Sequence, residues 1–136
     1  MNRAKLQDED FIEQFESCTL PGESFHHQDH VRLAWLYLRR HSLIDALIKF
    51  SEGLKRFATA KGNAGRYHET ITIAYVFLIH ERIKRSGSEQ SWEEFADTNV
   101  DLLDWKDNVL KGFYREETLF SDFARNVFVF PDLHSS

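Results

Sequence analysis

The fold is decided by one stretch of the chain, YHETITIAYVFLIHERIKR at residues 67–85. Between Ile71 and Ile79, only Thr72 and the hydroxyl of Tyr75 interrupt its apolar surface. The β-branched residues would suit a strand, but nineteen residues without Gly or Pro are far longer than a typical strand of about 5–6 residues. We therefore predict a helix, buried nearly all round, at the centre of an all-α domain. Its apolar part is too short for a bilayer, which needs about 20 residues.

Apolar residues recur at helical spacing on both sides of this stretch. Helices are predicted over residues 8–16, from about 29, from 43 to 57, from 91 to 113 with a break near 99, and from about 116. Because short connections make consecutive helices antiparallel neighbours, we expect a single-domain helical bundle of five to seven helices with an antiparallel four-helix core. One domain would span residues 1–136, with its core at about 8–130 and a loose C-terminal tail from Asp132.

Composition and charge narrow the function classes. The formal net charge is −5 and no block of Lys and Arg stands out, which disfavours nucleic acid as a partner because phosphate contacts need a basic face. The single cysteine, Cys18, excludes an internal disulfide, and a reducing cytosol fits it best. The first residues, MNRAKLQDEDF, lack the apolar core of a signal peptide. These observations predict a soluble cytoplasmic protein with no membrane partner.

The predicted topology brings polar residues together at one end of the bundle. The helix that starts near Asp29 and the helix that starts near His68 would both begin at that end, with an antiparallel helix between them. The segment that begins at Tyr114 and Arg115 would return to the same end if the preceding hairpin runs back to about Phe113. Three segments rich in ionisable groups would then converge.

The histidines at this end favour a metal site or acid–base chemistry. A helix N-terminus carries partial positive charge and favours neutral imidazole, the form that a metal ligand or a general base needs. His27, His30, His68 and Glu69 are the candidate ligands of a divalent metal such as Fe, Zn, Mn or Ni. Asp29 or His26 could replace one member of a two-histidine, one-carboxylate set.

Without a metal, the same end could act as a polar pocket. His30, His68 and Glu69 would then be catalytic acid–base groups, while Arg115, with Tyr67 and Tyr114, would bind a small anionic ligand. The structural alternative remains open. In that case Asp29 and Glu69 only stabilise helix N-termini, and the histidines hydrogen-bond to the backbone or to each other.

Two sequence motifs contain the candidate histidines and Glu69. They are FHHQDHVRLAWLYLRR at residues 25–40 and RYHETITIAYVFLIHER at residues 66–82. The chain resembles, from about Phe25 to Asp132, a group of small, functionally uncharacterised bacterial all-helical proteins with F-x-H-x-x-H and Y-H-E-T-x-T motifs. The residues that match the motifs are Phe25, His27, His30 and residues within 67–72, so the resemblance marks them as candidates. It implies no particular reaction.

Two classes of function follow from the sequence. The first is a small helical protein with a polar, metal-binding or catalytic His/Glu site at one end of the bundle. The second is a non-catalytic interaction or regulatory module, since three Trp and twelve Phe would allow an exposed aromatic patch and a homodimer. The sequence leaves open whether the protein is an enzyme.

Overall fold

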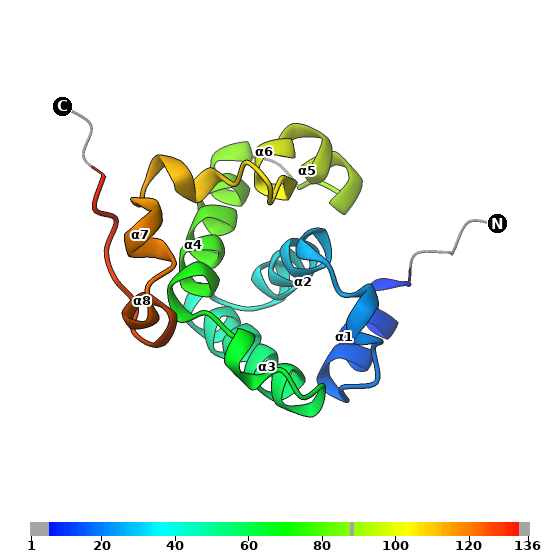
Figure 1. Cartoon of the computed structure of the whole chain (residues 1–136). Coiled ribbons are helices and arrows are strands. Elements are labelled where there is room, and N and C mark those ends of the chain that lie inside the picture. Colours follow the sequence, from blue (N-terminus) through cyan, green and yellow to red (C-terminus); the bar gives the residue numbers. More distant parts are fainter. Residues whose placement is uncertain (1–5, 88, 134–136) are drawn as a thin grey trace.

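The computed structural model of the chain describes residues 6–87 and 89–133, and within these ranges all regular structure is helical. Three long helices, α2 (His27–Arg40), α3 (Leu43–Ala60) and α4 (Glu69–Ser86), pack against one another as successive antiparallel neighbours (Figure 1). Helix α1 (Asp8–Glu16) lies against α2 and α3. The predicted all-α helical bundle is confirmed.

The remaining elements are short. They are α5 (Trp92–Thr98), α6 (Val100–Leu103), α7 (Glu116–Leu119), α8 (Asp122–Asn126) and the 3-10 helices η1 (Gly22–Ser24), η2 (Ala64–Arg66) and η3 (Val109–Gly112). The described part of the chain thus contains eight α-helices, more than the five to seven predicted, because the helix expected from about residue 116 is split in two, in addition to the break predicted near residue 99.

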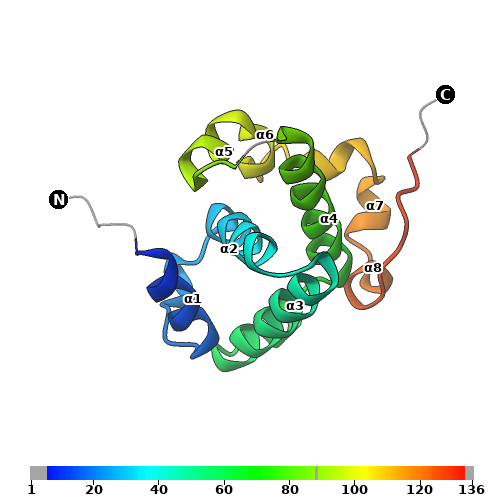
Figure 2. The same cartoon turned by 180° about the vertical axis from the view of Figure 1, so that it is seen from behind.

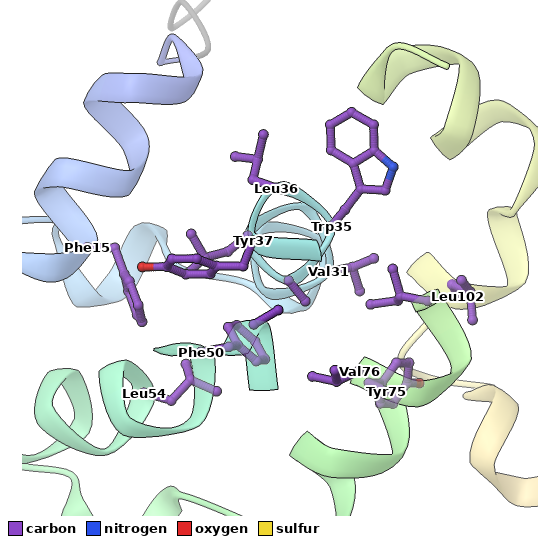
Figure 3. Packing of buried hydrophobic residues seen from close by; sticks show 14 of the residues in the cluster. Phe15, Val31, Trp35, Leu36, Tyr37, Phe50, Leu54, Tyr75, Val76 and Leu102 are labelled. Atoms are coloured by element: carbon purple, nitrogen blue, oxygen red, sulfur yellow. The ribbon is translucent and has the colours of Figure 1, made fainter. Parts of the chain in front are cut away.

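Helix α2, and not α4, is the central helix. Figure 3 views α2 along its axis with α1, α3, α4 and the α5–α6 segment around it. Seven consecutive residues, Val31–Tyr37, are buried. Helix α4 has an open outer face instead, on which Phe77 is 41% exposed. The prediction that the 67–85 helix is buried nearly all round was wrong, because its neighbours leave that face uncovered.

Helix α1 is held against this framework by a close approach and a buried cation. A Cβ atom at Gly53 of α3 would lie 2.6 Å from Cε2 of Phe15 in α1, so only glycine lets these helices approach so closely. The guanidinium of Arg32 in α2 is buried, lies 4.6 Å from the ring centroid of Phe11 and donates to Asp8 Oδ1 at 2.8 Å. A buried charge needs such a partner.

Several helix ends form as their sequence signals predict. The Ser42 hydroxyl accepts a hydrogen bond from the Asp45 amide at the start of α3. Ser91 and Glu94 form the reciprocal capping box of α5, at 3.1 and 2.9 Å. Helix α4 ends at Gly87, whose φ of 70° is left-handed, the conformation that favours glycine at this position.

The chain after α6 departs from the prediction. A loop and η3 replace the predicted helix up to Phe113, and the predicted last helix is split into α7 and α8. Of the apolar residues expected to be buried in that last helix, Phe120, Phe123 and Val127 are 46%, 64% and 45% exposed, whereas Leu119 is buried. The tail is fixed at Asp132, which accepts hydrogen bonds from the Arg115 amide and the Thr118 hydroxyl. The rest of the predicted loose tail, 134–136, lies outside the described residues.

This C-terminal part lies along α4, as Figure 2 shows from behind, and α8 packs directly on that helix. Among the residues that the structure describes, no helix combines the length and apolar character needed to cross a membrane.

Candidate functional site

The end of the bundle where α2 and α4 begin and α3 ends contains a cleft of about 410 Å³. The predicted meeting of the N-termini of these two helices is therefore confirmed. The cleft is lined by Phe25, His27, His30, Leu54, Phe57, Ala58, Lys61, Asn63, Arg66, Tyr67, His68, Ile71, Thr72 and Trp105. A smaller apolar recess of about 50 Å³, reaching toward Val31, Ala34, Phe50 and Ile79, shares five of these residues and adjoins the cleft.

His30 lies where the cleft meets the recess, because it lines both. It is on the first turn of α2, one turn after His27. Its ring stacks on Phe25, with centroids 4.1 Å apart and planes at 21°. Within the described residues its two ring nitrogens make no hydrogen bond. Desolvation, with smaller contributions from His27 and His26, lowers the pKa of His30 to about 4, so the imidazole is neutral near pH 7.

His27 is fixed by a hydrogen bond and by ring contacts. Its Nε2 lies 2.9 Å from the Leu102 carbonyl oxygen, and its ring contacts Tyr75 and Trp105, each at 5.0 Å between centroids. Desolvation lowers the pKa of His27, opposed by the bond to Leu102 and by Asp104. The neutral ring must therefore donate from Nε2 to the carbonyl, which leaves Nδ1 as an acceptor at the cleft.

His68 has a structural role that uses both ring nitrogens. Its Nδ1 accepts from the Ile71 amide at 3.1 Å and caps α4, while Nε2 donates to the Leu119 carbonyl at 2.7 Å. Burial lowers the pKa of His68, although the bond to Leu119 opposes this. Glu69 accepts a hydrogen bond from the Tyr67 hydroxyl at 2.6 Å and does not line the cleft. Both ring nitrogens of His68 and one carboxylate oxygen of Glu69 are thus engaged within the protein.

The predicted metal set is not assembled. No group of three or more His, Cys, Asp or Glu side chains suited to a metal ion occurs in the described ranges, 6–87 and 89–133. The physical reason is that His68 uses both nitrogens, His27 donates from one, and Glu69 is directed to Tyr67. Asp29, the alternative carboxylate, accepts from the His26 amide at 2.9 Å and stabilises the start of α2.

The predicted ligand-binding residues are separated. Tyr67 lines the cleft, but Tyr114 and Arg115 line a different hollow beside Leu119 and Leu133. The Tyr114 hydroxyl donates to the Val129 carbonyl at 2.7 Å. The chain does return to the start of α4, as the bond from His68 to Leu119 shows, but it presents a carbonyl there and not the side chain of Arg115.

Two cations of the cleft were missed from the sequence. Lys61 at the end of α3 and Arg66 in η2 line it, and neither forms an ion pair with a described carboxylate. Lys61 Nζ lies 5.3 Å from the centroid of the Phe57 ring. The segment 61–66 reads KGNAGR and looks like a plain loop. The segment carries two basic residues close to Tyr67 and His68, and this was the signal that could have identified it as part of the cleft.

The charged side chains that line the cleft are cations, although the protein is acidic. No Asp or Glu side chain of the described chain lines it, whereas Lys61 and Arg66 do. The first turns of α2 and α4 open here, and helix N-termini carry partial positive charge. The end of α3 adds partial negative charge. Lys61 offsets that charge, so the positive charge of Arg66 is left over.

Comparisons with protein-family models, with curated proteins and with solved structures give no match to this chain.

Proposed function

We propose that the chain binds a small organic anion with an apolar, aromatic body in the cleft between α2, α3 and α4. The carrying observation is the pair of cations, Lys61 and Arg66, which line an otherwise largely aromatic cleft without a carboxylate beside them. A guanidinium and an ammonium group that line the same cleft suit a carboxylate or a phosphate group.

The walls of the cleft support an aromatic or aliphatic body for this anion. Phe25, Phe57, Tyr67 and Trp105 contribute rings, and the adjoining recess is lined mainly by aliphatic side chains. Ligand pockets typically measure about 300–1,000 Å³ and are mostly apolar with a few polar groups that orient the ligand. At about 410 Å³ the cleft suits a small ligand of that kind.

The experiment that tests this proposal compares one anion with its neutral isostere. Purified protein is titrated with phenylacetate, phenyl phosphate, inorganic phosphate and uncharged phenylacetamide, and binding is followed by calorimetry and thermal melts. We expect phenylacetate or phenyl phosphate to bind and to raise the melting temperature, because a ligand that binds only the folded state stabilises it. Phenylacetamide and inorganic phosphate, each lacking one half of the ligand, should bind at least tenfold more weakly.

Variants of the two cations test whether the anionic probes bind in the cleft. Lys61→Met and Arg66→Met should each weaken binding of the anionic probes by about tenfold, a loss that is typical of a charge-assisted hydrogen bond. Lys49→Met and Arg85→Gln, on exposed surfaces outside the cleft, are the matched controls. Binding of the amide equal to that of the acid, or no binding of any probe, would overturn the proposal.

A specific observation favours a second function, a non-catalytic interaction module. Phe113, Phe120, Phe123, Val127, Phe130 and Leu133 are exposed apolar residues on the C-terminal part of the chain. Exposed apolar surface marks interaction sites where it is contiguous. Sedimentation equilibrium separates the two functions: a dimer that dissociates in the Phe123→Ser and Phe130→Ser double variant, in a protein that binds no anionic probe, would favour the second.

A further inference from the structure

The polar groups at the inner end of the cleft restrict what the ligand carries besides its anion. His30 and His27 lie one helical turn apart on α2 and both line the cleft and the recess. Among the residues that the structure describes, nothing donates a hydrogen bond to the rings of these two histidines. The ring nitrogens that the described residues leave without a partner are therefore at the cleft, where a ligand group can bond to them.

The kind of group follows from the protonation of the two rings. His27 donates from Nε2 to the Leu102 carbonyl at 2.9 Å, so its remaining nitrogen is an acceptor. A neutral imidazole has one N–H and one bare nitrogen, so His30 presents a second acceptor. The near-side carboxylates, Asp29 and Glu69, are directed to the His26 amide and the Tyr67 hydroxyl. The inner cleft thus offers two imidazole acceptors, beside the N–H of His30 and the hydroxyls of Thr72 and Tyr75 that line the recess, while Lys61 and Arg66 of the outer cleft are donors only.

We infer that the ligand is an aromatic acid that carries, apart from its anionic group, a hydroxyl or amino group, and that His30 accepts the hydrogen bond of that group. This inference rests on the proposed function, since the anion bound at Lys61 and Arg66 is what orients the ring toward His30. The stacking on Phe25 holds the plane of the His30 imidazole, in which its acceptor nitrogen lies.

The test uses phenylacetate, its three monohydroxy isomers and the three methoxy counterparts, with binding measured by calorimetry at pH 7. We expect at least one hydroxy isomer to bind about threefold to tenfold tighter than phenylacetate, the range for a neutral hydrogen bond. The corresponding methoxy compound keeps an oxygen but has no hydrogen to donate. It should lose this advantage.

Two variants of His30 separate its polar role from packing. His30→Phe keeps a ring to stack on Phe25 and has no acceptor nitrogen, so within this variant the hydroxy isomers should bind no tighter than phenylacetate. His30→Gln keeps an acceptor and should retain part of the advantage. His41→Phe, at an exposed histidine outside the cleft, is the control and should behave as the wild type does.

Each remaining outcome has a definite meaning. If no hydroxy isomer exceeds phenylacetate, if the methoxy compound binds equally well, or if His30→Phe retains the preference, the inference about His30 is overturned. Binding of phenylacetate that still depends on Lys61 and Arg66 would then leave the proposed function standing. If none of these probes binds, both the inference and the proposed function are wrong.

Discussion

At the scale of single residues, the three histidines of the cleft differ in what their ring nitrogens contact. Those of His68 are both occupied by main-chain groups, His27 has one occupied, and the ring of His30 has no hydrogen bond within the described chain. This difference decides which of them can interact with a ligand. His30 keeps a candidate binding role, whereas His68 is part of the structure that forms the cleft.

The lowered pKa of His30 makes a prediction about stability. In the unfolded chain this histidine takes up a proton near pH 6.5, but in the folded protein its pKa is about 4. Between these values the unfolded state binds more protons, so stability should fall as the pH drops from 6.5 to 4, by on the order of 2–3 kcal/mol from this residue. Below about pH 4 its contribution should level off.

Urea unfolding of the wild type and of His30→Gln at pH 7, 6, 5 and 4.5 measures this contribution. The variant should show a clearly shallower decline in its free energy of unfolding. Some slope will remain, because burial also lowers the pKa values of His27 and His68. Equal slopes for both proteins would show that His30 is protonated in the folded state as readily as in the unfolded chain.

The sequence could predict that these residues meet, but it could not predict what each one contacts. Convergence of His27, His30 and His68 follows from the antiparallel order of three long helices. The carbonyl groups that occupy His27 and His68 belong to Leu102 and Leu119, which are 75 and 51 residues away in the chain. Such partners depend on how short, irregular segments pack, and no local pattern encodes them.

At the scale of elements, predictability follows helix length. The helices from α1 to α5 carry several apolar residues at helical spacing or a capping signal, such as Ser42 or Ser91, and they form where the sequence predicts them. Helices α6, α7 and α8 have only four or five residues, little more than one turn of 3.6 residues. One turn has no periodicity to detect, so the sequence suggested longer helices there.

The packing of α1 on α3 makes a prediction for Gly53. In an exposed helix, Gly→Ala stabilises by up to about 1 kcal/mol. At Gly53 the new Cβ would lie 2.6 Å from Cε2 and 2.9 Å from Cζ of Phe15, which is itself completely buried. Gly53→Ala should therefore destabilise the protein by about 1–3 kcal/mol, as overpacking does.

The midpoint of urea unfolding measures this effect. Gly112→Ala is the matched control, because a Cβ atom there meets nothing within 4 Å and its φ is not left-handed, and we expect it to change stability by less than about 0.5 kcal/mol. A Gly53→Ala variant as stable as the wild type would show that α1 can move away from α3 without loss.

At the scale of the whole molecule, the C-terminal part is attached to α4 largely through a few specific hydrogen bonds. Thr70, which is fully buried, donates to the Val127 carbonyl at 3.0 Å and accepts from the Val129 amide at 3.2 Å. His68 bonds to Leu119 in the same region. Several aromatic side chains of this part remain exposed, so hydrophobic burial contributes less here than around α2.

Thr70→Val should therefore loosen the C-terminal part selectively. The isosteric change keeps the volume but removes two part-buried hydrogen bonds, each with a net contribution of about 0.5–1.5 kcal/mol. Hydrogen exchange should accelerate at Val129 and its neighbours and stay slow in α2, as expected for local opening.

The control is Thr59→Val, an exposed position of α3 whose hydroxyl makes no hydrogen bond in the described structure. It should leave exchange unchanged throughout. Uniform acceleration in Thr70→Val, in α2 as well as at Val129, would mean that the C-terminal part unfolds only together with the rest.

The burial of α2 on all sides has a consequence for how the sequence can change over evolution. A helix on a surface accepts substitutions on its outer face, but the seven consecutive buried positions of Val31–Tyr37 have no outer face. Their side chains point toward different neighbours, such as Tyr37 toward α1 and Trp35 toward α5 (Figure 3), and close packing constrains their size. Distant relatives would therefore be recognised by an unbroken block of bulky residues at this point, followed by far more freely drifting positions in α3 and α4.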